Sequence, residues 1–497
     1  MSKKAYIAID LGAESGRAIV GVLDRDRLTL EEVHRFLHLP VRLPSGLHWD
    51  LTGIWRGVLE GTRKAIDWAR ARDLDVVSLG VDTWGVDCAL VGQSGGLLGL
   101  PFCYRDERNG PAHDKLIDEV GWEALYAATG IQFMAINTLP QLVAWREAEP
   151  ELLGQAERLL FMPDLLNFFF TGKQTVEATI ASTSQMIDPV TGKWATELLN
   201  RVGLPGRMLG EITSPGTPIG RLLPAVAAEV GADDSLTVVA TASHDTASAV
   251  AAVPADPTTD WCYVSSGTWS LLGAELSEPC TSDAARLAPF TNEGGVEGTI
   301  RFLKNIAGLW LVQECRRHYE KHGDVYDYDQ LTAMAADAPP LVTLINLDHP
   351  SLAVAGDMPS RIAALARETG EPEPTDVGPQ IRCCLESLAM TYRHVLARLE
   401  EVLDRKFDVL HIVGGGGRNR LLSQMAADAT NRRVVVGPLE ATAVGNLLVQ
   451  AMASGDVADL AHIRRIARAS FEPETYLPRD PEAWDDAYGR FASLLKQ

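Results

Sequence analysis

The sequence has few cysteines and no long apolar run, and each shortage excludes a class of protein. Its 497 residues include seven cysteines, an odd number with no C-x-x-C spacing, which is typical of a reducing compartment. No stretch approaches the roughly 18 consecutive apolar residues of a membrane-spanning helix, and the first ten residues do not have the pattern of a secretory signal. We therefore expect a cytoplasmic protein with no membrane partner.

Positive charge is also scarce. Lysine and arginine number 45 against 66 aspartates and glutamates, which gives a formal net charge of −21. Because nucleic-acid backbones require basic surfaces, this balance argues against a nucleic-acid partner. It does not exclude a small phosphate ligand, since a few aimed N–H groups act locally. Nothing in the composition implies an obligate protein partner.

Several familiar motifs are missing or incomplete. Neither Gly-Lys pair is followed by Ser or Thr, so there is no Walker-type phosphate loop. The four glycines at 414–417 imitate a dinucleotide-binding pattern, but its sixth position is Asn419. Residues 92–96, G-Q-S-G-G, have the letters of a serine-hydrolase elbow, yet further glycines follow where a helix is required. No H-E-x-x-H or Cys/His cluster indicates a structural zinc site.

A glycine turn near the start of the chain is a candidate phosphate site. The apolar run Ala5–Ile9 ends at Asp10, Gly12 and Gly16 bracket a short turn, and a second apolar run follows. This pattern predicts strand, turn and strand. Glycines let backbone N–H groups approach a ligand, and an aspartate beside them can hold hydrated Mg²⁺ next to a phosphate. Taken alone, the segment also fits an ordinary hairpin.

The length predicts two large domains with a mixed α/β architecture. The segment A-A-V-P-A-D-P at 251–257 interrupts the pattern, so we place the domains at 1–252 and 253–497. A second strand–glycine–strand pattern at 261–276 opens the later domain. We further expect strands at 5–10, 18–23, 27–36, 75–91 and 236–242, helices at 51–69, 377–405 and 440–454, and a largely helical region at 112–170.

Three glycine-rich turns each follow a predicted strand, at 12–16, 265–268 and 414–417. Two hairpin turns facing the phosphates and a strand–helix turn near the adenosine would suit a nucleoside triphosphate held in a cleft. Tight connections without any ligand are the alternative for each turn taken singly.

Asp245 is the candidate general base. The string S-H-D-T-A-S-A-V at 243–250 follows a predicted buried strand, so Asp245 stands where strand becomes helix. A carboxylate there can orient a hydroxyl and take its proton during phosphoryl transfer. The alternative role is a helix N-cap. His244 can hydrogen-bond a sugar, or it can be a structural residue.

Two further segments are candidates for a sugar pocket. D-T-W-G-V-D at 82–87 gathers two carboxylates and an aromatic ring at one turn, with core packing as an equal alternative for Trp84. Y-R-D-E-R-N at 104–109 is either a second wall of the pocket or a solvated loop.

In combination these strings resemble the FGGY carbohydrate kinases, from about residue 5 to residue 450. The resemblance also rests on S-S-G-T-W-S, N-E-G-G, L-K-N-I-A-G-L-W-L-V-Q and I-V-G-G-G-G-R-N. It implies the actin-like ATPase (ribonuclease H-like) fold, with two domains and an active-site cleft between them. It also implies transfer of the ATP γ-phosphate, with Mg²⁺, to the 1-hydroxyl of L-rhamnulose in L-rhamnose catabolism. Fuculose, xylulose or a related polyol is the alternative substrate, and an ATPase-only member of the fold is the alternative class.

The resemblance also implies roles for individual residues. Asp245 matches the proton acceptor, and Asp10 is expected to hold Mg²⁺ through water. The expected sugar-binding residues are Gly85, His244, Asp245, Thr246 and Asn305, and the expected ATP-binding residues are Ala13, Glu14, Ser15, Gly16, Arg17, Thr268, Gln313 and Gly415.

Glu14 departs from the family pattern, which often has a small hydroxyl residue at this position. A carboxylate close to the phosphates would repel them unless it points away or meets the metal. We therefore expect the backbone of this turn, and not the Glu14 side chain, to bind the phosphates, with activity retained.

Overall fold

The structure is a computed structural model that describes residues 3–233 and 235–496, and it has the predicted mixed α/β architecture. It divides into two compact units. Unit 1 comprises Met1–Pro254, Glu275–Phe302 and Ala441–Ser470, and unit 2 comprises Ala255–Ala274, Leu303–Glu440 and Phe471–Gln497. Two segments of the later half of the chain thus belong to the unit that holds the N-terminal sheet.

Unit 1 is built on a six-stranded sheet with the order β13-β14-β6-β1-β2-β3. β1 and β2 form the predicted antiparallel hairpin, and β6 runs parallel to β1 with Asp82 opposite Asp10. The strands are β1 (Lys4–Leu11), β2 (Ser15–Asp24), β3 (Arg27–Leu37), β6 (Asp75–Thr83), β13 (Thr217–Arg221) and β14 (Thr237–Ala240).

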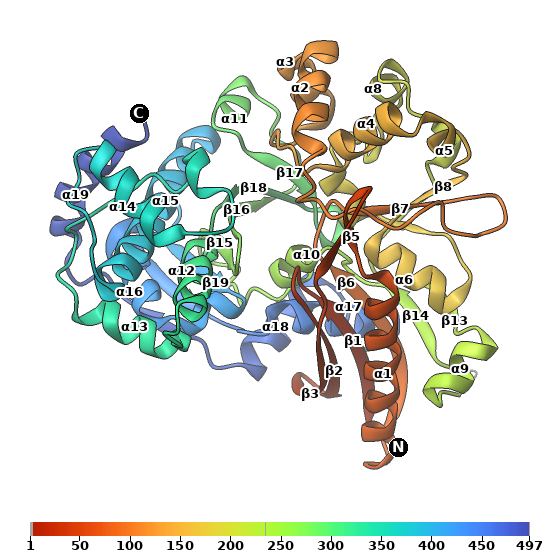
Figure 1. Ribbon diagram of the computed structural model, residues 1–497. Helices are drawn as coiled ribbons and strands as arrows, with labels where there is room; N and C mark the ends of the chain where they lie inside the picture. The colour runs from red at the N-terminus through yellow and green to blue at the C-terminus, as the bar shows by residue number, and fades with distance from the viewer. Residues whose placement is uncertain (1–2, 234, 497) are drawn as a thin grey trace. The chain divides into compact units, whose positions relative to one another are not determined.

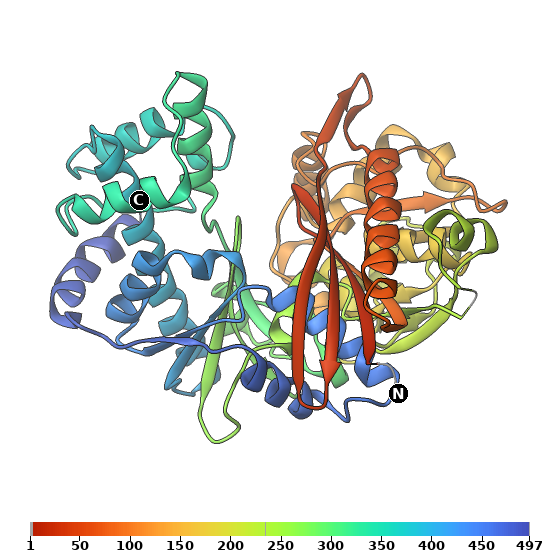
Figure 2. The same cartoon turned by 90° about the horizontal axis from the view of Figure 1, so that it is seen from below.

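Helices cover both faces of this sheet. α1 (Leu51–Arg70) lies along β1–β3 in Figure 1 and Figure 2, with Gly61 against Ala18. On the other face, Leu447 of α17 (Ala441–Ala453) packs against Gly21. Residues 18 and 21 differ in parity along one strand, so they face opposite sides of the sheet. Both predicted helices are confirmed.

The region predicted to be mostly helical is confirmed, with one strand inside it. β8 (Arg158–Phe161) pairs with β7 (Cys88–Val91) in a separate two-stranded sheet. The helices are α2 (Asn109–Val120), α3 (Trp122–Thr129), α4 (Thr138–Ala148), α5 (Pro150–Gly154) and α6 (Met162–Thr171).

Unit 1 also contains further elements, some of which carry candidate site residues. These are β5 (Gly46–Trp49), β9 (Val176–Glu177), α7 (Ala178–Ala181), α9 (Pro224–Val230), α10 (Asp245–Ala251), β17 (Thr291–Gly294) and α18 (Leu460–Ser470). Gly231 ends α9 in the left-handed conformation, as its position after an apolar helix predicts.

Unit 2 repeats the theme of a hairpin followed by parallel strands. β15 and β16 are antiparallel, while β15, β19 and β20 are parallel. The strands that lie wholly in unit 2 are β15 (Trp261–Ser266), β19 (Val409–Val413), β20 (Arg433–Val436) and β21 (Glu474–Tyr476). β16 (Ser270–Leu276) belongs to unit 2 up to Ala274, and β18 (Ile300–Ile306) belongs to it from Leu303. The helices are α12 (Trp310–Lys321), α13 (Tyr328–Asp337), α14 (Met358–Glu368), α15 (Val377–Leu403), α16 (Arg420–Thr430) and α19 (Pro481–Leu494).

Two sequence-based expectations concern the cysteines and membrane-spanning helices. Cys383 and Cys384 are buried in α15, and all seven cysteines, which lie within the described residues, are free thiols. Among the residues that the structure describes, no helix is both long and apolar enough to cross a membrane.

Candidate active site

The first glycine turn closes the β1–β2 hairpin of unit 1. The Gly12 N–H donates to the Ser15 carbonyl at 3.0 Å, which confirms the predicted tight turn. Glu14 is partly exposed, and so are the neighbouring residues 12, 13 and 15. Arg17, the third residue of β2, forms an ion pair with Asp10. The turn therefore presents its backbone at the surface of unit 1, beside one buried carboxylate and one cation.

Asp10 and Asp82 place two carboxylates side by side at the end of the sheet. Burial raises the pKa of Asp82 well above its usual range, and the charge of Asp10 raises it further. Oδ2 of Asp82 accepts from Nδ2 of Asn446 at 2.5 Å, whereas Oδ1 is buried without a hydrogen-bond partner. Two crowded carboxylates with one unpartnered buried oxygen fit the oxygen chemistry that Mg²⁺ requires.

This donor set is small for a metal site formed by protein alone. Within the described parts of the chain, no group of three or more His, Cys, Asp or Glu residues is placed to hold a metal ion. Mg²⁺ commonly uses one or two carboxylates and completes its shell with water and substrate phosphates. Asp10 and Asp82 suit that mode of binding.

Asp245 is the first residue of α10, and His244 occupies the N-cap position before it. The predicted alternative role of Asp245 as the N-cap is therefore wrong by one residue. Oδ1 of Asp245 accepts from the Thr246 backbone N–H at 2.5 Å and from its hydroxyl at 3.0 Å. The Asp245 side chain is 29% exposed, so its carboxylate is held at one oxygen and accessible to a ligand.

The chain around His244 is fixed from two sides. The Thr83 N–H donates to the Ser243 carbonyl at 2.9 Å, which ties this segment to the end of β6. The His244 N–H donates to the Thr179 hydroxyl at 3.2 Å, and Glu177 accepts from that hydroxyl at 2.6 Å. The candidate base thus follows a segment that two neighbouring elements hold in place.

The His244 ring lies between Asp245 and a buried ion pair. Its Nε2 is 3.3 Å from Oδ1 of Asp245, and its Nδ1 is 3.3 Å from Oε2 of Glu293. Nη2 of Arg301 lies 3.0 Å from the same Nδ1. A Cβ atom on Gly85 would lie 3.2 Å from Nε2, which is tighter than most Cβ contacts. Gly85, His244 and Asp245, predicted together for the sugar, are neighbours in unit 1.

Asp87 stabilises the aromatic part of the D-T-W-G-V-D segment. Its carboxylate accepts from the indole N–H groups of Trp49 and Trp84 at 2.6 and 2.9 Å, and from Gln141 at 3.0 Å. Burial raises the pKa of Asp87 to about 6, although these donors lower it in part. Trp84 is 5% exposed, which favours the core-packing alternative for this ring. Asp87 is thus occupied by donors from the protein.

The Y-R-D-E-R-N segment is a packed turn and not a solvated loop. Asp106 is buried and accepts from the Leu47 N–H at 2.5 Å. The Arg108 guanidinium carbon lies 3.2 Å from the centroid of the Phe102 ring. Arg105 and Glu107 are the exposed members of the segment.

Unit 2 brings two glycine turns together. In the turn after β19, Gly414 has a φ of +86°, and a Cβ atom there would lie 3.0 Å from the Ser266 carbonyl oxygen. A Cβ atom on Gly416 would lie 2.1 Å from the Ser266 hydroxyl oxygen. Space for a side chain is open only at Gly415 among these three positions. Close approach to the β15–β16 turn therefore requires glycine at 414 and 416.

The start of α12 joins the same group of residues. The backbone N–H groups of Leu309 and Trp310 donate to the carbonyls of Gly267 and Thr268 at 3.0 and 3.2 Å. Nε2 of Gln313 donates to the Thr268 hydroxyl at 3.1 Å. Thr268 and Gln313, predicted for the nucleotide, are thus hydrogen-bonded to each other. Asn305 lies on β18 and is half-buried.

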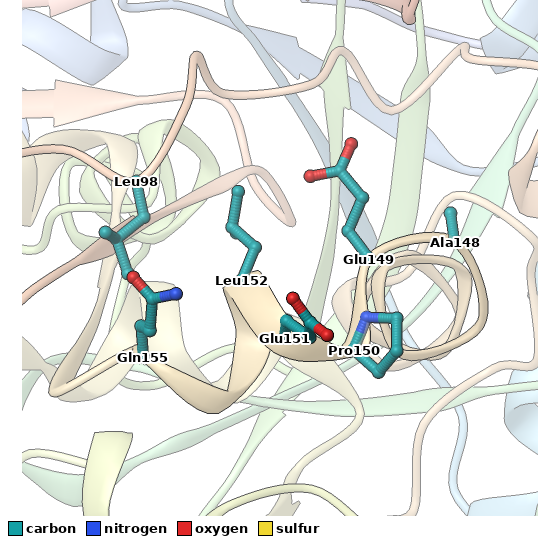
Figure 3. Close-up of a pocket in the computed structure, with 7 residues that line it drawn as sticks. All are labelled: Leu98, Ala148, Glu149, Pro150, Glu151, Leu152 and Gln155. Atoms are coloured by element: carbon teal, nitrogen blue, oxygen red, sulfur yellow. The ribbon is translucent and has the colours of Figure 1, made fainter.

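A separate hollow lies at the surface of unit 1, between the loop after β7 and the α4–α5 connection (Figure 3). It measures about 470 Å³ and contains none of the predicted site residues. Its lining is formed by Leu98, Ala148, Glu149, Pro150, Glu151, Leu152 and Gln155. The candidate site therefore rests on the convergence of side chains and not on this hollow.

Sequence reasoning assigned no role to four residues that touch this site. Glu293 belongs to the N-E-G-G string, which was a signal of the family without a stated role. Arg301, Asn446 and His38 stand in no recognisable motif. His38 stacks on the Trp84 ring, with centroids 5.2 Å apart, behind the first glycine turn. Contacts between segments that are distant in sequence bring these residues to the site.

Comparison with known families gives two matches that together span most of the chain. The N-terminal domain of the FGGY family of carbohydrate kinases matches residues 5–252, and the C-terminal domain matches residues 262–454. Rhamnulokinase of Bacteroides thetaiotaomicron is 41% identical over 494 residues, covering 99% of this chain and 100% of the relative. Rhamnulokinase of Bacillus subtilis is 36% identical over 485 residues, covering 96% of each chain.

Solved structures agree in fold. A ligand-bound xylulose kinase from Lactobacillus acidophilus superimposes with a TM-score of 0.81 at 16% identity, covering 99% of this chain and 97% of its own. Plasmodium falciparum glycerol kinase with ADP gives 0.78 at 14% identity, covering 100% and 98%. At these identities the solved structures show only that the two-domain α/β fold is shared. The family matches and the curated relatives show family membership. The chain belongs to the FGGY family of carbohydrate kinases.

Proposed function

We propose that this sugar kinase transfers the γ-phosphate of ATP to the 1-hydroxyl of L-rhamnulose, giving L-rhamnulose 1-phosphate in L-rhamnose catabolism. The substrate follows from the curated relatives, which are named rhamnulokinases at 36–41% identity over nearly the whole chain. The observation that carries the chemistry is the accessible Asp245 carboxylate beside His244. Another ketose, such as fuculose or xylulose, is the second candidate, because few contacts distinguish one hydroxyl configuration.

Asp245 acts as the general base in this proposal. Thr246 engages Oδ1, so we assign Oδ2 to the sugar hydroxyl. As the proton moves to the carboxylate, the hydroxyl oxygen bonds to the γ-phosphorus and the bond from that phosphorus to the β–γ bridging oxygen breaks. ADP leaves with the electron pair of that bond. A carboxylate suits this work because it orients the nucleophile and accepts its proton.

The sugar contacts follow from the residues around the base. The His244 ring faces the carboxylate at 3.3 Å and lies where it can contact a neighbouring sugar hydroxyl. Glycine at 85 leaves the ring uncovered on that side, where a larger residue would press on Nε2. Thr246 and Asn305 complete the sugar-binding set that we propose.

The nucleotide contacts divide between backbone and side chains. We assign the turn at 13–17 and Thr268 to the phosphates, and Gln313 and Gly415 to the remainder of the nucleotide. Asp10, with Asp82 beside it, would hold Mg²⁺. When bound, the metal supplies positive charge to the phosphate oxygens. The Glu14 side chain takes no part in binding ATP in this proposal.

The deciding experiment measures ATP consumption over a panel of ketoses, with Asp245→Asn beside the wild type. We expect sugar-dependent ADP release that is fastest with L-rhamnulose. Loss of the base should lower kcat by about 10²–10⁴-fold and leave substrate binding largely intact. Asp283→Asn is a matched control, because Asp283 is also the first residue of a helix and its side chain is 88% exposed.

Three outcomes would contradict parts of the proposal. Equal turnover by wild type and Asp245→Asn would remove the base assignment. ADP release without any sugar dependence would favour the ATPase-only class. A higher kcat/KM with fuculose or xylulose would replace the substrate and keep the chemistry.

A further inference from the structure

A buried ion pair behind His244 has no role in the reaction as described so far. Arg301 on β18 is fully buried, and its Nη1 lies 3.0 Å from Oε2 of Glu293 on β17. Nε of Arg301 donates to the Gly294 carbonyl at 2.9 Å. Burying two charges is costly unless close partners compensate them. Such a pair directly behind a candidate substrate-binding ring therefore calls for a functional explanation.

The strand that carries Glu293 is held firmly in unit 1. The side-chain amide of Asn292 donates to the Gly130 carbonyl at 2.9 Å, and its oxygen accepts from the Cys280 N–H at 2.7 Å. On the other side of Glu293, the Gly294 N–H donates to the Ser182 hydroxyl at 2.8 Å. The ion pair thus has a fixed frame on which to orient the ring.

The pair also constrains where His244 carries its proton. Nδ1 of His244 lies 3.0 Å from Nη2 of Arg301, which can only donate, and 3.3 Å from Oε2 of Glu293, which can only accept. The shorter contact, with Arg301, makes Nδ1 the acceptor. The proton of the neutral ring then lies on Nε2, the atom that faces Asp245. Glu293 supplies the negative charge that keeps Arg301 compensated in this buried place.

Glu293 is in the right ionisation state for this task. Burial raises its pKa, but its neighbours, foremost the charge of Arg301, lower it by more, so that its pKa lies below the usual range. The group is a carboxylate at neutral pH, and the pair with Arg301 is ionic.

We propose that Glu293 and Arg301 are positioning residues that hold His244 as its Nε2–H tautomer toward Asp245. Nε2–H then donates to Oδ1 of Asp245 and supports the orientation in which Oδ2 receives the hydroxyl proton. The inference rests on the proposed function for its kinetic consequence, but the tautomer is a property of the unliganded protein. A role in packing alone would leave both the tautomer and the reaction unaffected by a substitution that conserves volume and net charge.

The test uses the full chain and the double variant Glu293→Gln/Arg301→Met, which removes both charges together. Single variants would leave an uncompensated buried charge and risk misfolding. Glu386→Gln/Arg382→Met is the matched control, because it removes a 2.7 Å pair within α15 that takes no part in either site. Long-range ¹H–¹⁵N spectra of histidine-labelled protein report the tautomer, and the His244 signal is assigned by its loss in His244→Asn.

We expect Nε2–H in the wild type and the control, and a mixture of tautomers in the Glu293/Arg301 double variant. With the most active ketose, kcat of that variant should fall at least about tenfold, while KM for ATP stays within twofold. This loss is smaller than that of the base itself.

An unchanged tautomer with lowered kcat would mean a merely structural role, and a changed tautomer with unchanged kcat would mean no role in the reaction. Either result overturns the proposal, as does an imidazolium ring in the wild type at neutral pH. If the wild type shows no sugar-dependent turnover, the proposed function fails by itself, and the spectra still decide whether the ion pair sets the tautomer.

Discussion

The two candidate ligand-binding regions of this chain differ in the groups that form them. In unit 2, the nucleotide-side residues gather around two backbone turns, with Thr268 and Gln313 as the main polar side chains. In unit 1, the sugar-side residues lie within a network of buried charges around His244, which includes Glu177, Glu293 and Arg301. One region thus depends on how closely backbones approach, and the other on charges that compensate one another.

The difference predicts different sensitivities. Where backbones approach within contact distance, any added Cβ atom forces a shift, whatever the chemistry of the side chain. Where buried charges are paired, removing one partner leaves the other uncompensated, at a cost of about 3–5 kcal/mol. Substitutions that add volume should therefore damage unit 2 most, and substitutions that remove charge should damage unit 1 most.

The largest expected effect in unit 2 comes from Gly416→Ala. The new Cβ atom would lie 2.1 Å from the Ser266 hydroxyl oxygen and 3.0 Å from the Ser266 carbonyl carbon, so the two turns must separate. Overpacking of this kind costs about 1–3 kcal/mol. KM for ATP should rise about 10- to 100-fold, measured by steady-state kinetics, and the melting temperature should fall.

Two further variants decide whether the effect arises from the turn contact. Adding Ser266→Gly to Gly416→Ala removes the hydroxyl and Cβ that clash, and should restore part of the ATP affinity. Gly415→Ala meets no atom within 4 Å, so it should leave the melting temperature unchanged and weaken ATP binding only. Unchanged ATP kinetics in Gly415→Ala would separate this turn from the nucleotide.

The sequence could predict unit 2's turns because a backbone site has a local signature. A strand followed by a run of glycines indicates a close approach at that point of the chain, and the structure places Gly414 and Gly416 against Ser266. The first hairpin and the helices at 51–69 and 440–454 were predictable for a similar reason, since apolar periodicity is a local property.

The network in unit 1 could not be predicted in the same way. Glu293 and Arg301 contact His244 through side chains that are about 50 residues away in sequence, and no local pattern encodes that approach. Asp87 stood in a motif that suggested a sugar wall, yet its carboxylate is taken up by Trp49, Trp84 and Gln141. Residue types at one turn do not reveal which partners approach from elsewhere.

His38 makes the folding stability of unit 1 depend on pH, whereas the backbone turns of unit 2 contribute no titrating group. Burial lowers its pKa from 6.5 to about 4, only partly offset by backbone groups of Gly12 and Ser15. Between these pH values the unfolded chain binds a proton that the folded chain does not bind, so stability falls as the pH drops from 6.5 toward 4. At pH 5 this amounts to about 2 kcal/mol.

The variant His38→Phe should abolish this term. Denaturant unfolding at pH 7 and pH 5 should show the wild type losing about 2 kcal/mol more than the variant over that interval. Because other groups titrate equally in both proteins, the difference between their two pH dependences isolates His38. Parallel losses in wild type and variant would show that His38 is not the group responsible.

The smallest expected effect, and the most specific to the sugar, comes from Gly85→Ala. The added methyl group would lie 3.2 Å from Nε2 of His244 and 3.3 Å from Thr183, so the ring must move by a few tenths of an ångström. KM for the most active ketose should rise about three- to tenfold, the lower part of the cost of overpacking, with KM for ATP unchanged.

Gly92→Ala is the matched control for this substitution. A Cβ atom at Gly92 would also meet its nearest atom at 3.2 Å, but that atom is the flexible end of the Leu98 side chain, away from His244. The two variants share the local crowding and differ in whether it reaches the imidazole. Equal effects of both on the ketose KM would mean that strain in unit 1, and not displacement of His244, weakens sugar binding. A rise in the ketose KM in Gly85→Ala alone, with KM for ATP unchanged, would show that the charge network around His244 serves sugar binding and not ATP binding.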